Sequence, residues 1–443
     1  MSDVRQILSM NRFAGEVPDA DASDLADRLR RRRATFGSSS VLFYERPIEM
    51  IRGQGAYLFD HGGRRYLDFY NNVPSVGHCH PKVVEAISHQ AAQLNIHTRY
   101  LVRPVEDYAE RLLATFPAPL TNLVMTCTGS ESNDLALRIA ESATGAKGFV
   151  VTRAAYHGNT AAVTEISPSL LRMRAPAAHI RTISAPDVAD APDGDVAASF
   201  SRAITAAASE LSEAGVGFAG LIVDTIFSSD GIHADPPGFL QAAAMAVKKA
   251  GGVFIADEVQ PGFGRTGAGL WGFARHGMLP DIVTMGKPMG NGFPMGGVVT
   301  RPDLLDTFCD STGYFNTFGG NPVAAAAGLA VLKVIEEEGL VVNAATIGSI
   351  LLEKLRELGK KYTRIGAVRG AGLFIGVDLV DPGSGAPSPG TASQVINSLK
   401  ERSILVGAAG LHGNTLKIRP PLCVGEQEVA LFAEGLNDVL QAI

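Results

Sequence analysis

Two short apolar runs, each followed by a charged residue, constrain the fold of this chain more than any other feature. One run, at residues 253–256, ends at Asp257, and the other, at residues 282–285, is followed by Gly286 and Lys287. Their length and composition predict buried parallel strands. Ligands in open α/β sheets bind beyond the carboxyl ends of the strands. We therefore expect the carboxylate of Asp257 and the amine of Lys287 to face one crevice.

Further apolar runs alternate with helical segments along the chain. They predict strands at residues 123–125, 149–151, 221–224 and 297–300, and helices at 134–141 and from Asn321-Pro322 to Gly339. This alternation is typical of an α/β fold with a mostly parallel sheet and helices on both faces. We divide the chain into an N-terminal arm with short strands that belong to the small domain (1–75), a large domain (76–329) and a C-terminal small domain (330–443).

Composition excludes several classes of protein. The 443 residues are 46% hydrophobic and 19% charged, which is ordinary for a globular protein. A net charge of −6 gives no reason to expect nucleic acid binding, and the basic run at residues 28–33 is interpreted as a solvated helix face. Four scattered cysteines fit neither a disulfide framework nor a zinc site. Without a signal sequence or a membrane-spanning run, we expect a cytoplasmic protein with no membrane contact.

A lysine in such a crevice can form a Schiff base with a carbonyl cofactor, and pyridoxal phosphate is the predicted one. Its pyridine nitrogen needs an acid to stay protonated, which Asp257 can supply. The sequence T-G-S-E-S-N-D places Gly129 and Ser130 at a helix N-terminus, which suits a phosphate, although a plain capped helix start is equally compatible. Tyr156, before His157 and a glycine, can lie against a flat cofactor or be a surface aromatic residue.

Two other chemistries are weaker interpretations. The cluster His78-Cys79-His80 could suggest a metal, but adjacent residues do not share one face and no second ligand group has zinc-like spacing. We therefore predict no metal site. A nicotinamide cofactor at Gly290-Asn291-Gly292 fails because the glycine spacing is wrong and no strand-to-helix turn surrounds it.

Taken in order, these motifs make the chain similar to the class III aminotransferases, pyridoxal phosphate enzymes of fold type I. The motifs are T-G-S-E-S-N-D, Y-H-G, D-E-V-Q, a lysine 30 positions after its aspartate, T-F-G-G-N-P and K-I-R-P-P-L. Within the class, N-N-V-P-S-V-G-H-C-H-P, T-M-G-K-P-M-G-N-G and Y-F-N-T-F-G-G-N-P resemble the alanine-glyoxylate aminotransferase 2-like branch, which includes ethanolamine-phosphate phospholyases. The resemblance runs from about residue 45 to the end. It implies a large domain with a mostly parallel seven-stranded sheet, a smaller α/β C-terminal domain and an N-terminal segment.

The resemblance also implies a cofactor site. Lys287 would hold pyridoxal phosphate as a Schiff base, Asp257 would pair with the ring nitrogen, and Gln260 would hydrogen-bond the phenolic oxygen. Val259 and Tyr156 would enclose the ring. The complete implied set is Gly129, Ser130, Tyr156, His157, Asp257, Val259, Gln260, Lys287 and Thr317.

Two of the implied contacts concern partners. Thr317 would reach the cofactor phosphate of the neighbouring subunit, which implies a homodimer, with a tetramer also open. Arg419 matches an arginine that binds a substrate carboxylate, for which a guanidinium is well suited. Many family members read E-P-x-Q-G-E-x-G where this chain begins with Asp224, and Ser229 replaces their second glutamate. That glutamate pairs with the arginine in some members, so the amino donor stays open.

Transamination is the predicted reaction. An amine substrate would displace Lys287, which would then act as the general base, and the amino group would pass to a 2-oxo acid such as pyruvate. The alternative is a phospholyase, which needs further cations from residues such as Arg99, Arg103 or Arg174. Ser169 and Leu170 weigh against it, since the phospholyase pattern continues there with an aromatic residue and a lysine. A non-enzymatic protein that only binds the cofactor or dimerises is a third interpretation, and the intact Lys287, Asp257 and Gln260 disfavour it.

Overall fold

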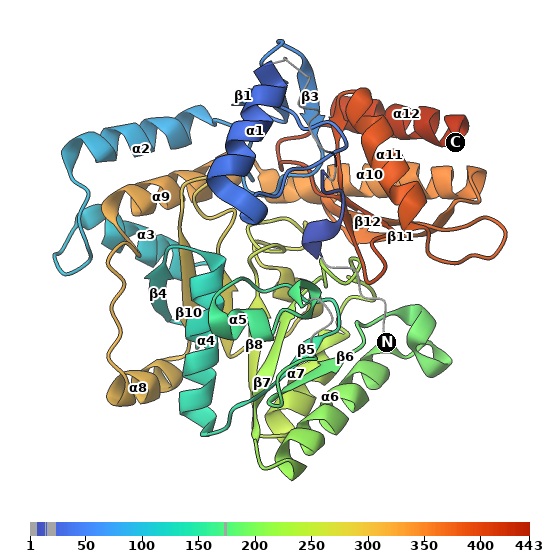
Figure 1. Cartoon of the computed structure of the whole chain (residues 1–443). Helices are drawn as coiled ribbons and strands as arrows, with labels where there is room; N and C mark the ends of the chain where they lie inside the picture. The colour runs from blue at the N-terminus through green and yellow to red at the C-terminus, as the bar shows by residue number, and fades with distance from the viewer. Residues whose placement is uncertain (1–6, 14, 16–23, 172–174) are drawn as a thin grey trace.

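The computed structural model describes residues 7–13, 15, 24–171 and 175–443. A seven-stranded sheet forms its centre (Figure 1). In spatial order the strands are β4 (Asn122–Thr126), β10 (Gly296–Thr300), β9 (Ile282–Met285), β8 (Val253–Asp257), β7 (Phe218–Asp224), β5 (Gly148–Thr152) and β6 (Ile180–Ile183). Only β10 is antiparallel to its neighbours. The predicted mostly parallel seven-stranded sheet is confirmed.

Helices cover both faces of this sheet because successive strand side chains point to opposite sides. On β8, Ile255 packs with the core beneath α4 (Gly129–Thr144), whereas its neighbours Phe254 and Ala256 pack with the opposite core. The first face is covered by α4, α5 (Ala161–Glu165) and α8 (Pro302–Ser311). The second is covered by α6 (Val196–Glu213) and α7 (Leu240–Lys249). Helix α9 (Pro322–Glu337) packs against α10 (Leu340–Lys361), which lies against the C-terminal part of the chain.

The C-terminal part contributes an antiparallel sheet whose order is β11 (Ile365–Ala371), β12 (Phe374–Leu379), β15 (Thr415–Ile418) and β14 (Gly407–Ala409). Helices α11 (Pro389–Glu401) and α12 (Glu426–Ala442) complete this part. A third sheet joins β1 (Met50–Gln54), β2 (Tyr57–Asp60) and β3 (Arg65–Asp68) to β13 (Ile404–Leu405). The N-terminal strands and the C-terminal part therefore share one sheet.

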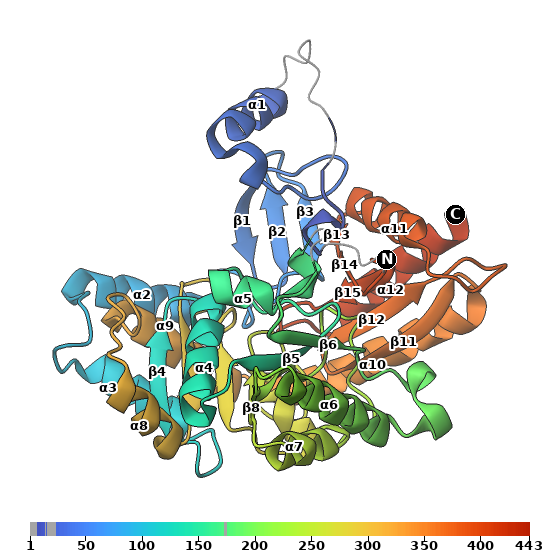
Figure 2. The ribbon, with the colours of Figure 1, turned by 60° about the horizontal axis from the view of Figure 1, so that its bottom comes forward.

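The remaining helices lie around these sheets. Helices α2 (Pro81–Gln93) and α3 (Arg103–Leu113) pack along α9, and α1 (Asp24–Phe36) stands clear of the large sheet (Figure 2). The short 3-10 turns are η1 (Ile7–Ser9), η2 (Gly37–Ser39), η3 (Pro168–Leu170), η4 (Val188–Asp190), η5 (Pro192–Gly194) and η6 (Gly272–His276). Within the described residues, no helix has the length and apolar character needed to cross a bilayer.

One helix boundary was predicted wrongly. Helix α4 begins at Gly129 rather than at residue 134, because the hydroxyl of Thr128 accepts the backbone N–H of Glu131 at 3.1 Å and so caps the helix early. The start of α9 is confirmed, since the side chain of Asn321 accepts the N–H of Ala324 at 2.9 Å.

Candidate active site

Asp257 lies at the carboxyl end of β8, and its carboxylate is only 4% exposed. Its Oδ2 accepts hydrogen bonds from Nδ1 of His157 at 2.7 Å and from Nδ2 of Asn133 at 3.0 Å. Its Oδ1 accepts the backbone N–H of Val259 at 3.0 Å. Because a carboxylate can only accept, His157 must carry its proton on Nδ1. The three donors satisfy this buried acid and fix its orientation.

Lys287 is the second residue after the end of β9, as the sequence predicts. Its amine borders two cavities, of 260 Å³ and 180 Å³, which share Lys287 and Tyr156 in their walls. Burial, followed by the positive charge of Arg419, lowers the pKa of Lys287. A lowered pKa favours the neutral amine, which is the form that attacks a carbonyl or accepts a proton.

The larger cavity, here called the cofactor cavity, joins the motifs that the sequence singled out. Gly129 and Ser130 at the start of α4 line it, as do His157 and Val259. The last two are hydrogen-bonded to Asp257, so the carboxylate lies directly behind this wall. The full lining is Val73, Cys127, Thr128, Gly129, Ser130, Tyr156, His157, Gly158, Val259, Lys287, Gly292, Phe293, Pro294 and Met295.

Three glycines allow the segments around this cavity to pack closely together. A Cβ at Gly129 would lie 2.8 Å from a methyl of Val259, and one at Gly158 would lie 2.4 Å from Oγ of Ser130. A Cβ at Gly286 would lie 2.9 Å from the backbone nitrogen of Gly129. The N-terminal turn of α4 lines the cavity, where helix N–H groups suit a phosphate. An amine, a buried acid and a phosphate cradle around one cavity fit pyridoxal phosphate.

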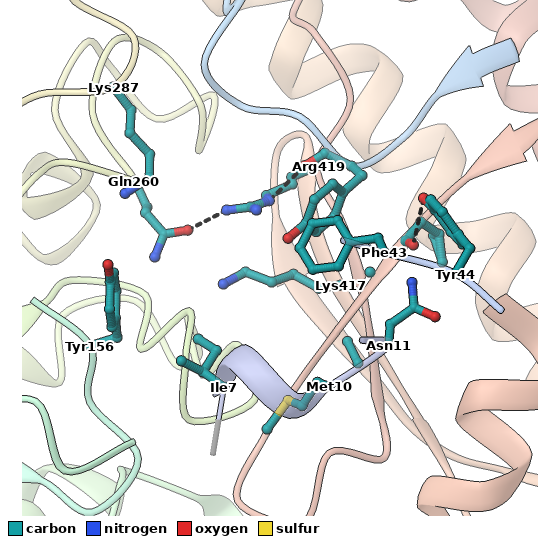
Figure 3. Close-up of a pocket in the computed structure, with 14 residues that line it drawn as sticks. Ile7, Met10, Asn11, Phe43, Tyr44, Tyr156, Gln260, Lys287, Lys417 and Arg419 are labelled. Carbon is teal, nitrogen blue, oxygen red and sulfur yellow. Dashed lines mark hydrogen bonds between the residues drawn. The ribbon is translucent and has the colours of Figure 1, made fainter. Parts of the chain in front are cut away.

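The smaller cavity, here called the substrate cavity, is rich in positive charge. Figure 3 shows Gln260, Lys417 and Tyr156 pointing toward one space, with Arg419 beside them. The guanidinium of Arg419 donates from Nη1 to Oε1 of Gln260 and from Nε to the carbonyl of Tyr70 at 2.7 Å. The rest of the lining of the substrate cavity includes Ile7, Met10, Asn11, Phe43 and Tyr44 from the N-terminal arm.

Lys417 lies on β15 and is 3% exposed, while Arg419, two residues later, is 8% exposed. Residues two apart on a strand point to the same side, so both cations reach the substrate cavity. Burial and then the charge of Arg419 hold the pKa of Lys417 well below its usual range. Burial also raises the pKa of Asp224, an effect that the nearby Asp257 strengthens. An anionic ligand would relieve the repulsion between the two cations.

The structure separates other predicted residues from the site. Arg99 lies over the ring of Phe315 at 4.1 Å, and Arg103 is exposed at the first position of α3. Neither lines the substrate or the cofactor cavity. Arg174 lies outside the described residues. The structure therefore does not support Arg99 or Arg103 as the additional cation that a phospholyase needs.

Thr317 is exposed and does not line this chain's own cofactor cavity. Ser229 is buried, its hydroxyl has no hydrogen-bond partner within the described part of the chain, and its carbonyl accepts the N–H of Gly410 at 3.1 Å. The two clustered histidines face different partners. His78 contacts Asp68 at 2.7 Å, and His80 contacts Glu338 at 3.0 Å.

Sequence reasoning missed two residues of this site. Asn133 bridges Asp257 and the carbonyl of His157, and its own oxygen accepts the hydroxyl of Thr284 at 2.6 Å. Lys417 was read only as part of a strand. The sequence does contain a signal for Lys417. Residues two apart in an extended segment point to the same side, so Lys417 is expected to face the same cavity as Arg419.

This fold and site define a pyridoxal phosphate enzyme of fold type I. The chain belongs to the class III aminotransferase family, whose model matches residues 43–440. It is 39% identical to an alanine-glyoxylate aminotransferase 2-like protein of Drosophila melanogaster, over 97% of this chain and 91% of the relative. It is 38% identical to ethanolamine-phosphate phospho-lyase homolog 1 of Caenorhabditis elegans, over 97% of each.

Among solved structures, the chain is similar to a phospholyase from Arthrobacter in complex with phosphoethanolamine. The two are 43% identical with a TM-score of 0.91, over 94% of this chain and 100% of the other. An aminotransferase from Bacillus anthracis is 26% identical with a TM-score of 0.84, over 94% of this chain and 98% of the other. Relatives with both kinds of reaction in their names thus share this fold.

Proposed function

We propose that this enzyme eliminates phosphate from a small phosphorylated amine. The observation that carries the proposal is the pair of buried basic side chains, Lys417 and Arg419, in the cavity that also contains Lys287, where a bound anion would favour the charged form of Lys417. A phosphate monoester carries nearly two negative charges at neutral pH, whereas a carboxylate carries one. Among the described residues, neither side-chain hydrogen bond of Arg419 is to a carboxylate, so its charge is available to a ligand.

The size of the substrate cavity supports a small substrate. Its 180 Å³ is below the usual range for drug-sized ligands, and side chains of the N-terminal arm, including Met10 and Phe43, form part of its wall. The similarity to a phospholyase in complex with phosphoethanolamine points in the same direction. Ser169, which argued against this reaction in the sequence, is buried and donates to the carbonyl of Ala155 at 2.8 Å. That position therefore gives no geometric objection.

The residues of this chain divide the chemistry between them. Lys287, Asp257, Gly129 and Ser130 would hold pyridoxal phosphate, which when bound withdraws electrons from the substrate carbon that carries the amine. The neutral amine of Lys287 would take the proton from that carbon. The bond from the neighbouring carbon to the phosphate oxygen would then break, and inorganic phosphate would leave with the bonding electrons. The unsaturated amine that remains would take up water and give an aldehyde and ammonia. Lys417 and Arg419 would hold the leaving group as its charge develops.

The test is to incubate the purified enzyme with phosphoethanolamine and to measure released phosphate and aldehyde. In parallel, a panel of amines with pyruvate is assayed for alanine. Lys417→Met should reduce phosphate release by roughly tenfold or more, because it removes one buried charge from the leaving group. Lys82→Met, which changes an exposed lysine, is the matched control. Alanine formation without phosphate release would refute the proposal.

Transamination is the second candidate, and it was the reaction that the sequence favoured. The position of Lys417, which the sequence argument did not use, is what moves our preference. The hydrogen bonding of Arg419 is also compatible with transamination. Its guanidinium pairs with Gln260 rather than with an acid, so it can bind the carboxylate of a keto acid. Alanine formed from pyruvate in the amine panel would establish it.

We further propose that the active unit is a homodimer. Near the exposed Thr317, the side chains of Phe318 and Phe315 are 71% and 44% exposed, and Tyr100 is 63% exposed. His97 stacks on Tyr100 at 5.4 Å and meets Phe315 edge-on at 6.0 Å, so the two segments form one aromatic surface. A second copy covering this surface would place Thr317 near the partner's cofactor cavity. Light scattering of the purified enzyme tests the dimer.

The cytoplasmic location of the protein stays a prediction, which cell fractionation can check.

A further inference from the structure

Asp68 is a buried carboxylate outside the proposed catalytic set. It ends β3, is fully buried, and accepts the backbone N–H groups of Tyr70 at 3.0 Å and of Asn71 at 2.9 Å. Its other oxygen is 2.7 Å from Nε2 of His78. Since a carboxylate only accepts, His78 donates this hydrogen bond. The backbone of His78 is itself fixed by two hydrogen bonds with Gly55, of 2.8 and 3.1 Å.

The turn that Asp68 closes supplies most of the contacts of Arg419. The carbonyl of Phe69 accepts the backbone N–H of Arg419 at 2.9 Å, and the carbonyl of Tyr70 accepts its Nε at 2.7 Å. The centre of the guanidinium lies 4.7 Å from the ring of Tyr70. Both residues directly follow Asp68 in the chain. Any rotation of this turn would therefore move the guanidinium relative to the substrate cavity.

We propose that Asp68 and His78 are positioning residues for Arg419, and that the pair sets the affinity of the substrate cavity for anions. The proposal rests on the role of Arg419 under the proposed function. Neither Asp68 nor His78 lines the substrate cavity as the described residues form it, so the pair acts through Tyr70 and Arg419. His78 fixes the carboxylate, the carboxylate fixes the turn, and the two carbonyls of the turn hold Arg419 in one orientation.

The position of His78 allows a matched pair of variants. Gln in place of His78 retains an N–H donor for Asp68, whereas Leu retains the bulk without a donor. His80→Leu is the control, because His80 lies two residues away and contacts Glu338 instead. Each holoenzyme is titrated with inorganic phosphate and with pyruvate by calorimetry, and the visible absorbance of its bound cofactor and its melting temperature are recorded.

We expect His78→Leu to weaken the binding of both anions by roughly tenfold, a change typical of losing a well-oriented charged hydrogen bond. His78→Gln should recover most of this loss, and His80→Leu should bind as the parent does. The cofactor absorbance should be unchanged throughout. Equal anion binding by His78→Leu and the parent would overturn the inference, as would a loss that His78→Gln does not recover.

Arg419→Lys separates this inference from the proposed function. If Arg419→Lys weakens anion binding but His78→Leu does not, only the positioning role fails. If Arg419→Lys leaves anion binding unchanged, the proposed role of Arg419 fails, and the inference that depends on it fails too.

Discussion

Hydrogen bonds orient the buried acid of this site, and burial lowers the pKa of its amine. Asp257 is buried, yet it receives donors from His157, Asn133 and the backbone of Val259, which together support a carboxylate. Lys287 lies among other cations, and burial with the charge of Arg419 lowers its pKa. The acid is thus held in one orientation, while the amine is brought toward its neutral form. That division is what a carbonyl cofactor requires of its two partners.

The role of Lys287 predicts a spectroscopic change. Lys287→Ala removes the amine that would bind the cofactor covalently, so the purified variant should lose the visible absorbance band of the bound cofactor and its activity. Lys361→Ala, at an exposed lysine of α10, should keep both. An unchanged visible spectrum of Lys287→Ala after dialysis would contradict the assignment.

Glu258, next to Asp257, predicts a dependence of stability on pH. Burial raises the pKa of this fully buried carboxyl from 4.5 to about 7. The folded protein then binds a proton that the unfolded chain has released, so its free energy of unfolding falls as pH rises from about 4.5 to about 7. The loss is on the order of 3 kcal/mol.

Glu258→Gln removes this titration. The free energy of unfolding of Glu258→Gln should therefore increase relative to the parent between about pH 5 and about pH 8, measured by urea unfolding. Glu357→Gln on the exposed side of α10 should show no such change. A parent–variant difference that is the same at both pH values would rule out Glu258 as the titrating group.

At the scale of elements, strand ends were the predictable part of this molecule. The runs at β8 and β9 are short, apolar and followed by charged residues. The sequence alone therefore predicts that Asp257 and Lys287 lie at one edge of a sheet. The sequence placed Gly129 and Ser130 at the N-terminus of α4 but began its regular part at residue 134. The hydrogen bonds from the N–H groups of Glu131 and Ser132 to Thr128 make the segment helical from Gly129.

Contacts between elements distant in the chain were not predictable. Arg419 follows β15 and Gln260 follows β8, 159 residues apart, and nothing in either segment specifies their hydrogen bond. Lys417 was overlooked for a related reason, since a lysine is usually exposed, whereas here it lies on β15 between β12 and β14 and faces a cavity that the N-terminal arm partly lines. The division of the chain at residue 330 stays a prediction.

The entry to α4 predicts that one glycine is required for cofactor binding. Gly158→Ala would place a methyl group 2.4 Å from Oγ of Ser130, at a φ of +142°, which L side chains rarely adopt. We expect its affinity for pyridoxal phosphate to fall by roughly tenfold or more, measured by titrating the apoprotein with cofactor and following absorbance.

The opposite end of the same helix supplies the control. Gly145 also has a positive φ, +69°, but a Cβ there meets nothing within 4 Å. Gly145→Ala should lower the free energy of unfolding by about 1 kcal/mol while leaving cofactor affinity unchanged. Equal cofactor affinities for the two variants would show that the space at Gly158 is not needed.

At the scale of the whole molecule, the site is assembled from segments that span the sequence. The large sheet supplies Asp257 and Lys287, the C-terminal sheet supplies Lys417 and Arg419, and the N-terminal arm closes the substrate cavity. Cofactor and substrate therefore meet where separately formed parts of the fold come together. In the proposed homodimer, the exposed Thr317 of a second copy would contribute as well.

That contribution predicts complementation between two defective variants. Lys287→Ala destroys its own site but retains Thr317, whereas Thr317→Ala retains Lys287 but offers its partner no hydroxyl. If Thr317 acts across a dimer interface, a mixed dimer contains one site with Lys287 from one subunit and Thr317 from the other. Random reassociation of equal amounts should then restore activity to about a quarter of that of the parent, since half of the dimers are mixed and each has one complete site.

The activity of mixtures prepared by unfolding and refolding the two variants together measures this complementation. Mixing without unfolding is the control, because intact dimers would exchange slowly. Thr317 acting within its own subunit would instead leave both sites of every mixed dimer defective, and the mixture would show only the average of the two separate activities. Since the two arrangements differ only in which subunit supplies the hydroxyl, the measured recovery distinguishes them directly.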